Sequence, residues 1–193
     1  MKSITVFCGS SLGTKNKFHE EAFSLGQKLA HQKISVVYGG AKIGLMGKVA
    51  EGALSAGGNV TGIIPHFLTE KEILHTELTE LIVVNTMHER KKLMNETCDG
   101  FIALPGGFGT LEELFEILTW AQLGLHQKPI GLLNIDGFFD DLDKMIQKMV
   151  DTEFLREENK NMLLKSETID DLLTQMQKYE APEIPKWINL QDT

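Results

Sequence analysis

Short apolar runs alternate with longer amphipathic stretches along this chain of 193 residues. Most of the runs are continuous stretches of β-branched and other apolar side chains, which is typical of strands buried on both faces. These runs are Ile4–Cys8, Ile34–Tyr38, Val60–Ile64, Leu81–Val84, Phe101–Leu104 and Pro129–Leu133. Strands of this kind, each followed by a helical segment, predict a parallel sheet with helices on both faces.

The segments between the runs have helical periodicity. Residues 17–32 bring Ala22, Leu25 and Leu29 to one face, and a helix that begins in the glycine turn 39–47 is expected to end near Ser55. One further helix is predicted with 87–92 in its first turns, and others after Thr110, over 138–150 and over 169–179. Residues 66–79 are polar and predicted to be irregular, and a mixed segment lies between the last two helices.

The predicted fold is a Rossmann-like, doubly wound α/β fold. Right-handed crossovers between parallel strands produce this arrangement. We expect one domain over residues 1–180 and a loosely packed C-terminal tail over 181–193. Ligands of such sheets bind at the carboxyl ends of the strands. The turns after Cys8, Tyr38 and Leu104, and the helix start after Val84, should therefore meet at one edge.

Charge and composition exclude several classes of function. The net charge of -8 argues against a nucleic-acid-binding surface, because phosphate backbones attract stripes of Lys and Arg. No apolar run approaches the roughly 20 residues of a membrane helix, and the first strand begins at once, so we expect a cytoplasmic protein. Cys8 and Cys98 form no metal-binding pattern and are expected to be small buried side chains, and no metal or cofactor is predicted.

The stretch from Leu104 to Glu113 is the strongest candidate for chemistry. A strand ends at Pro105, three glycines follow within four positions, and a helix begins. Such a turn aims backbone N–H groups into one concavity, and the helix N-terminus adds positive potential, so an anion such as phosphate is expected there. Glu112 and Glu113 directly after this turn suit a ligand with an anionic end and a part that becomes cationic during reaction.

A structural explanation of the same residues is also open. Thr110-x-x-Glu113 has the spacing of a capping box, in which both side chains serve only the helix start. The turn containing Gly40, Gly44 and Gly47 does not match the dinucleotide fingerprint, and it lacks the spacing and hydroxyl of a phosphate-binding P-loop.

Two basic residues lie at an unusual position. The run His88–Lys92 is, by pattern alone, often a solvated helix face, but Arg90 and Lys91 near a helix N-terminus oppose its dipole. Their placement indicates a partner, most simply a substrate phosphate or a carboxylate such as Glu113. Thr119 lies two turns beyond Glu112 on the same face and, taken alone, is an ordinary surface threonine.

Residues 105–113 resemble the PGGxGTxxE signature of the LONELY GUY family, phosphoribohydrolases of cytokinin riboside monophosphates that were long labelled lysine decarboxylases. Other blocks resemble the family in the same order. They are 6–11, 37–40, 43–47, 87–91 and 119–124. No pyridoxal-binding lysine, which a decarboxylase would require, is recognisable.

The resemblance implies hydrolysis of the N-glycosidic bond in cytokinin riboside 5'-monophosphates, AMP or both, by a homodimer with sites near the subunit interface. Arg90 and Glu113 match the family's catalytic residues. The predicted substrate-binding residues are Ser10, Gly39, Gly40, Met87, Lys91, Gly106, Gly107, Phe108, Gly109, Thr110, Leu111, Glu112 and Thr119.

One position departs from the family pattern. Plant members carry a substrate-contacting glutamate before the fourth strand, and that position is Thr76 here, with Glu77 beside it. Either Glu77 substitutes for it or the contact is absent. The alternative function is a non-catalytic nucleotide-binding protein, a sensor or carrier that uses the same glycine turn, whereas a DNA-associated function is disfavoured by charge.

Overall fold

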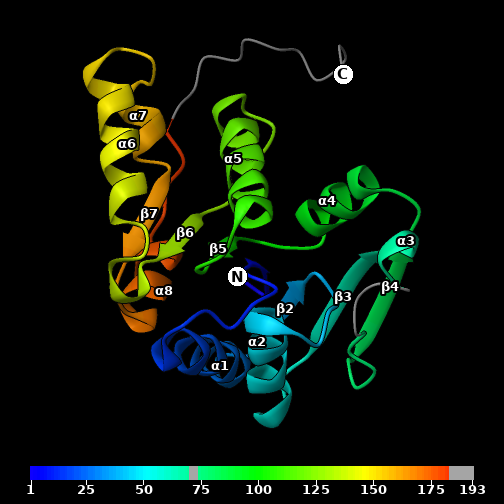
Figure 1. The fold of residues 1–193 in the computed structure, drawn as a ribbon. Coiled ribbons are helices and arrows are strands. Elements are labelled where there is room, and N and C mark those ends of the chain that lie inside the picture. Colours follow the sequence, from blue (N-terminus) through cyan, green and yellow to red (C-terminus); the bar gives the residue numbers. More distant parts are fainter. Residues whose placement is uncertain (70–73, 183–193) are drawn as a thin grey trace.

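The computed structural model describes residues 1–69 and 74–182 of the chain. Within them lies one sheet of seven parallel strands in the order β4-β3-β2-β1-β5-β6-β7 (Figure 1). The strands are β1 (Ser3–Phe7), β2 (Ser35–Tyr38), β3 (Val60–Pro65), β4 (Glu80–Val84), β5 (Phe101–Ala103), β6 (Ile130–Leu133) and β7 (Leu163–Ser166). The chain winds outward from β1 in both directions, so the predicted doubly wound α/β fold is confirmed.

Helices cover both faces of the sheet. They are α1 (Asn16–His31), α2 (Gly44–Ser55), α3 (His66–Thr69), α4 (Met87–Glu96), α5 (Phe108–Gln122), α6 (Asp140–Asp151), α7 (Glu157–Lys160) and α8 (Ile169–Gln177), with a 3-10 turn at Ile135–Gly137. Helices α1, α2 and α8 pack into one hydrophobic cluster, and α4 and α5 pack into the other (Figure 1). None of the helices in this part of the chain is long and apolar enough to cross a membrane.

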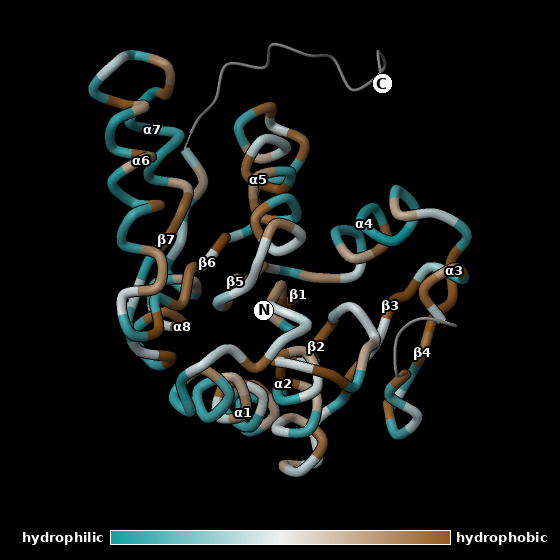
Figure 2. Tube along the Cα trace, in the orientation of Figure 1, coloured by the Kyte–Doolittle hydropathy of each residue, from teal (hydrophilic) through white to brown (hydrophobic). Residues whose placement is uncertain are grey.

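Alternation along the strands divides the core between these faces. Ile4 and Val6 of β1 belong to the cluster under α1 and α2, whereas Phe7 belongs to the cluster under α4 and α5. Figure 2 shows brown, hydrophobic segments along the central strands and teal, hydrophilic segments on α1 and α6. Cys8 and Cys98 are both buried, as predicted.

The structure adds detail to several segments that the sequence left open, and it corrects others. The mixed segment after α6 contains the short helix α7 and the strand β7. The sequence did not reveal β7, because this strand is half-buried at the sheet edge and offers only two apolar residues. The irregular segment 66–79 includes the single turn α3. Within α5, Ile117 is buried, whereas Phe115 is exposed. Most of the predicted tail, 183–193, lies outside the described residues.

Three turns lock together at the carboxyl edge of the sheet. The Gly9 N–H donates to the Pro105 carbonyl at 3.0 Å, and the Leu45 N–H donates to the Gly9 carbonyl at 3.0 Å. Gly44 has a φ of +61° and lies so close to Ser10 that any Cβ there would overlap the Ser10 backbone. These contacts fix the turns after β1 and β5 and the start of α2 against one another, and thereby frame the site.

Candidate active site

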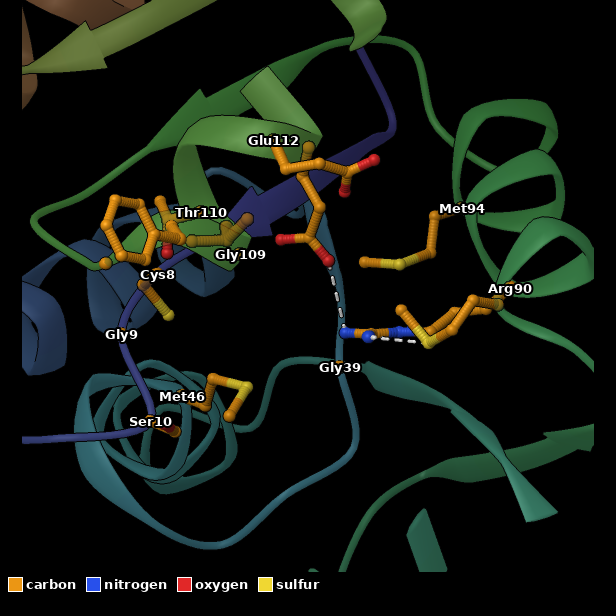
Figure 3. A pocket seen from close by; sticks show the side chains of 15 residues that line it. Cys8, Gly9, Ser10, Gly39, Met46, Arg90, Met94, Gly109, Thr110 and Glu112 are labelled. Carbon is orange, nitrogen blue, oxygen red and sulfur yellow. Dashed lines mark hydrogen bonds and ion pairs between the residues drawn. The ribbon is translucent and has the colours of Figure 1, made fainter. Parts of the chain in front are cut away.

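A cavity of about 310 Å³ opens where these turns meet α4 and α5 (Figure 3). Most of the predicted site residues line it. They are Ser10, Gly39, Met87, Arg90, Gly107, Phe108, Gly109, Thr110, Glu112 and Glu113. They come from four separate segments of the chain, so the expectation that strand ends would collect them at one edge is confirmed.

Other predicted site residues stand behind or beside the cavity. Gly106 lies beneath Thr110, where a Cβ would overlap the Thr110 hydroxyl oxygen, and the Gly40 carbonyl accepts the His75 N–H at 3.2 Å. The Thr119 hydroxyl donates to the Phe115 carbonyl at 2.7 Å and borders a groove between α5 and α6. Leu111 packs on the core. None of these four is among the residues that line the cavity within the described chain.

An ion pair crosses the cavity from α4 to α5. The Arg90 Nη2 lies 3.3 Å from the Glu113 Oε1, and each side chain is only 11% exposed (dashed in Figure 3). Arg90 thus has the carboxylate partner that its place at a helix start indicated. Burial raises the pKa of Glu113 from 4.5 to about 7, against the opposing effect of the Arg90 guanidinium. Glu113 therefore changes charge near neutral pH.

The guanidinium of Arg90 keeps donors for a further acceptor. Its Nη1 makes only a weak contact of 3.8 Å to the Met87 sulfur, and its buried Nε has no acceptor among the described residues. Gly39 makes room for it, because a Cβ there would lie 2.5 Å from Nη2. A buried guanidinium with unused N–H groups is suited to bind phosphate or ribose oxygens.

The start of α5 is built as an anion cradle. The first N–H groups of any helix have no acceptor within the helix. Because α5 is preceded by Gly107, which supplies no side-chain cap, these N–H groups of α5 are left for a ligand. Gly107 and Gly109 face open space where side chains would otherwise stand. The capping-box interpretation is wrong, because the helix begins at Phe108, Thr110 is buried inside its first turn, and Glu113 faces Arg90.

Lys91 is held outside the cavity by two carboxylates. Its Nζ lies 2.6 Å from Glu112 Oε1 and 2.9 Å from Glu116 Oε1, and its side chain is 11% exposed. Burial alone would lower the pKa of Lys91, but its hydrogen bonds to Glu112 and Glu116 outweigh burial and raise that pKa. Of these three residues, only Glu112 also lines the cavity.

Sequence reasoning missed three sulfur-containing side chains of the cavity lining. Cys8, Met46 and Met94 line the cavity beside the predicted residues (Figure 3). Met94 follows Arg90 by four positions on α4, a spacing that shares one helix face and therefore pointed to the site. Burial, and secondly the Glu113 charge, raises the pKa of the Cys8 thiol well above its ordinary value, so Cys8 lines the cavity as an uncharged thiol.

In the described part of the loop before β4, residues 74–79, the Glu77 carboxylate does not reach the cavity. Glu77 Oε2 lies 3.7 Å from Lys42 Nζ, and both Thr76 and Glu77 are exposed. Neither residue is part of the lining. Among the described residues of this loop, no carboxylate takes the place of the glutamate that the family resemblance led us to expect before β4.

Comparison with known proteins identifies the family. A family model described as "Possible lysine decarboxylase" matches residues 46–176. Cytokinin riboside 5'-monophosphate phosphoribohydrolase LOG2 of Arabidopsis thaliana is 44% identical over 92% of this chain and 84% of its own length. The chain belongs to the LONELY GUY family. LOG7 of the same plant is 45% identical over 93% of this LONELY GUY protein and 82% of its own length.

Solved structures share the fold at lower identity. The molybdenum cofactor carrier protein of Chlamydomonas reinhardtii has a TM-score of 0.71 and 19% identity, over 91% of this chain and 96% of that one. DNA processing protein A of Helicobacter pylori has a TM-score of 0.60 and 14% identity, over 92% of this chain and 81% of that one. At such identity these likenesses bear on the fold alone.

Proposed function

We propose that this protein is a nucleoside 5'-monophosphate phosphoribohydrolase. It cleaves the N-glycosidic bond of cytokinin riboside 5'-monophosphates, AMP or both, and releases the free base and ribose 5-phosphate. The observation that carries the proposal is that the Glu113 carboxylate and the open start of α5 line the same cavity. The names of the LOG2 and LOG7 relatives support the same reaction.

The substrate phosphate binds at the start of α5. The free N–H groups of its first turn, beside the Gly107 and Gly109 backbone, face the cavity and attract an anion. Arg90 donates its unused N–H groups to phosphate or ribose oxygens. Anchored at one end, the ribose is oriented with its anomeric carbon toward Glu113, and this orientation lowers the entropic part of the barrier.

Glu113 stabilises the charge that develops on the ribose. As the C1'–N bond lengthens, its electron pair leaves with the base and the ring acquires oxocarbenium character. The ionised carboxylate stabilises that charge and accepts a proton from the attacking water, whose oxygen bonds to C1'. The base nitrogen takes up a proton from solvent, and Glu113 returns its own, so protons balance.

We further propose that the protein is a cytoplasmic homodimer. Phe108 lines the cavity and is 94% exposed, and a second subunit near the site would give this ring an apolar neighbour. No cofactor, nucleic acid or membrane is part of the proposed reaction. Size-exclusion chromatography with light scattering measures the assembly, and a monomer at micromolar concentration contradicts the dimer.

Incubation with AMP and, separately, with isopentenyladenosine monophosphate tests the activity. Free base and ribose 5-phosphate are expected in equal amounts, and the ratio of kcat/KM values identifies the preferred base. Glu113→Gln keeps the shape of the side chain and is expected to abolish turnover while the protein still binds ribose 5-phosphate. Nucleotide binding without release of base by the unaltered protein would instead support a sensor or carrier.

A further inference from the structure

A second ion-pair system lies directly beside the reaction cavity. Arg90 and Lys91 are adjacent on α4, and each faces carboxylates of α5. Arg90 pairs inside the cavity with Glu113, whereas Lys91 pairs with Glu112 at 2.6 Å and Glu116 at 2.9 Å. The ammonium is therefore shared between two anions, and both of its contacts have the geometry of charge-assisted hydrogen bonds.

Only one of the two carboxylates that hold Lys91 lines the cavity. Glu112 is part of the cavity lining. Glu116 follows it by one helical turn and borders a separate surface hollow with His88 and Trp120. Glu116 thus draws Lys91 along α5, away from the Gly107–Thr110 turn that we assign to phosphate.

We propose that Glu116 is a positioning residue that holds the Lys91 ammonium away from the cavity and competes for it with the phosphate of the substrate. The inference rests on the proposed function. Lys91 is not part of the cavity lining, so its ammonium has to move away from its contact with Glu116 to reach a phosphate in the cavity. Glu116 is the carboxylate outside the cavity, and its contact is the longer of the two.

The energetic effect of this competition is modest because the cluster is partly exposed. Glu116 is 23% exposed at its side chain, and ion pairs of this kind contribute up to about 1 kcal/mol. Glu116→Gln removes the charge and keeps the side-chain shape. It is expected to lower the KM for AMP roughly twofold to fivefold, the change in affinity that this energy allows, with kcat nearly unchanged.

The experiment compares wild type, Glu116→Gln and Glu96→Gln. Glu96 pairs with Lys92 on the exposed side of α4 at 3.9 Å, so its variant removes the same charge away from Lys91 and is expected to leave KM unaltered. Calorimetry with ribose 5-phosphate is run in parallel. Tighter binding of this product by Glu116→Gln, by the same factor as the fall in KM, supports competition. Glu116→Asp keeps the charge and is expected to restore the wild-type KM in part.

The opposite result overturns the proposal. If Glu116 only braces α4 against α5, Glu116→Gln raises KM, lowers the melting temperature, or leaves KM unchanged. A fall in KM shared by Glu96→Gln makes the effect one of net charge and contradicts a specific role. If wild type releases no base, the proposed activity fails, and the calorimetric comparison alone decides the role of Glu116. Absence of ribose 5-phosphate binding to wild type contradicts both proposals.

Discussion

The buried carboxylate of Glu113 makes the stability of the protein depend on pH in a predictable direction. Its pKa is raised from 4.5 in the unfolded chain to about 7 in the folded protein, mainly by burial. The folded protein therefore binds a proton more tightly than the unfolded chain. The resulting stability is fully present below pH 4.5 and is lost as pH rises through about 7.

The magnitude follows from the two pKa values. A pKa difference of about 2.5 corresponds to about 3 kcal/mol at 1.36 kcal/mol for each pKa unit. Glu113→Gln stays neutral at every pH and resembles the protonated side chain. The free energy of unfolding of wild type, minus that of Glu113→Gln, is expected to fall by about 2 to 3 kcal/mol between pH 5 and pH 8.

Urea denaturation of both proteins at four pH values between 5 and 8 measures this difference. Coincident transitions by circular dichroism and fluorescence establish that a single unfolding free energy applies. Subtracting the unfolding free energy of Glu113→Gln from that of wild type at each pH cancels the contribution of every other titrating group whose pKa the substitution does not change. Two curves that stay parallel from pH 5 to pH 8, or a difference that grows in favour of wild type as pH rises, refute the assignment of Glu113 as a buried carboxylate with a raised pKa.

Three further outcomes follow from the same geometry. The kcat/KM of wild type is expected to rise with pH through about 7, because only ionised Glu113 stabilises the ribosyl cation; a profile that falls over this range indicates that the protonated form reacts. Gly39→Ala places a Cβ 2.5 Å from Arg90 Nη2, which forces the guanidinium to shift. The substitution should lower kcat/KM at least about tenfold with little change in melting temperature, whereas unaltered kinetics would show that the guanidinium has room to move. Gly44→Ala combines a φ of +61° with overlap on Ser10 and should cost about 3 kcal/mol in a denaturant titration, and a loss below about 1 kcal/mol contradicts the locked turns.

The sheet was predictable because its central strands are continuous apolar runs. Burial on both faces leaves no polar positions in a strand such as Phe101–Ala103, and the sequence reveals it at once. Edge strand β7 has one partner and is half-buried, so Leu163 and Leu164 alone could not be distinguished from a loop. The hydrophobic pattern of a strand is therefore clearest where the strand is most deeply buried.

The pairing of Arg90 with Glu113 was foreseeable from electrostatics. A cation at a helix N-terminus is unfavourable without a partner, and the candidate carboxylates follow the next strand. The pairing of Lys91 with Glu116 was not foreseeable, because it depends on the distance between α4 and α5. The capping-box spacing of Thr110 and Glu113 was misleading, since α5 begins two residues earlier and the threonine is buried against Gly106.

The central claim is that a ribosyl phosphate spans the start of α5 and Glu113. A crystal structure of Glu113→Gln with AMP tests it most directly. We predict the phosphate at the N–H groups of residues 107–110 and the side chain of residue 113 within about 3.5 Å of the anomeric carbon. A phosphate bound elsewhere, or a ribose turned away from residue 113, would contradict the account.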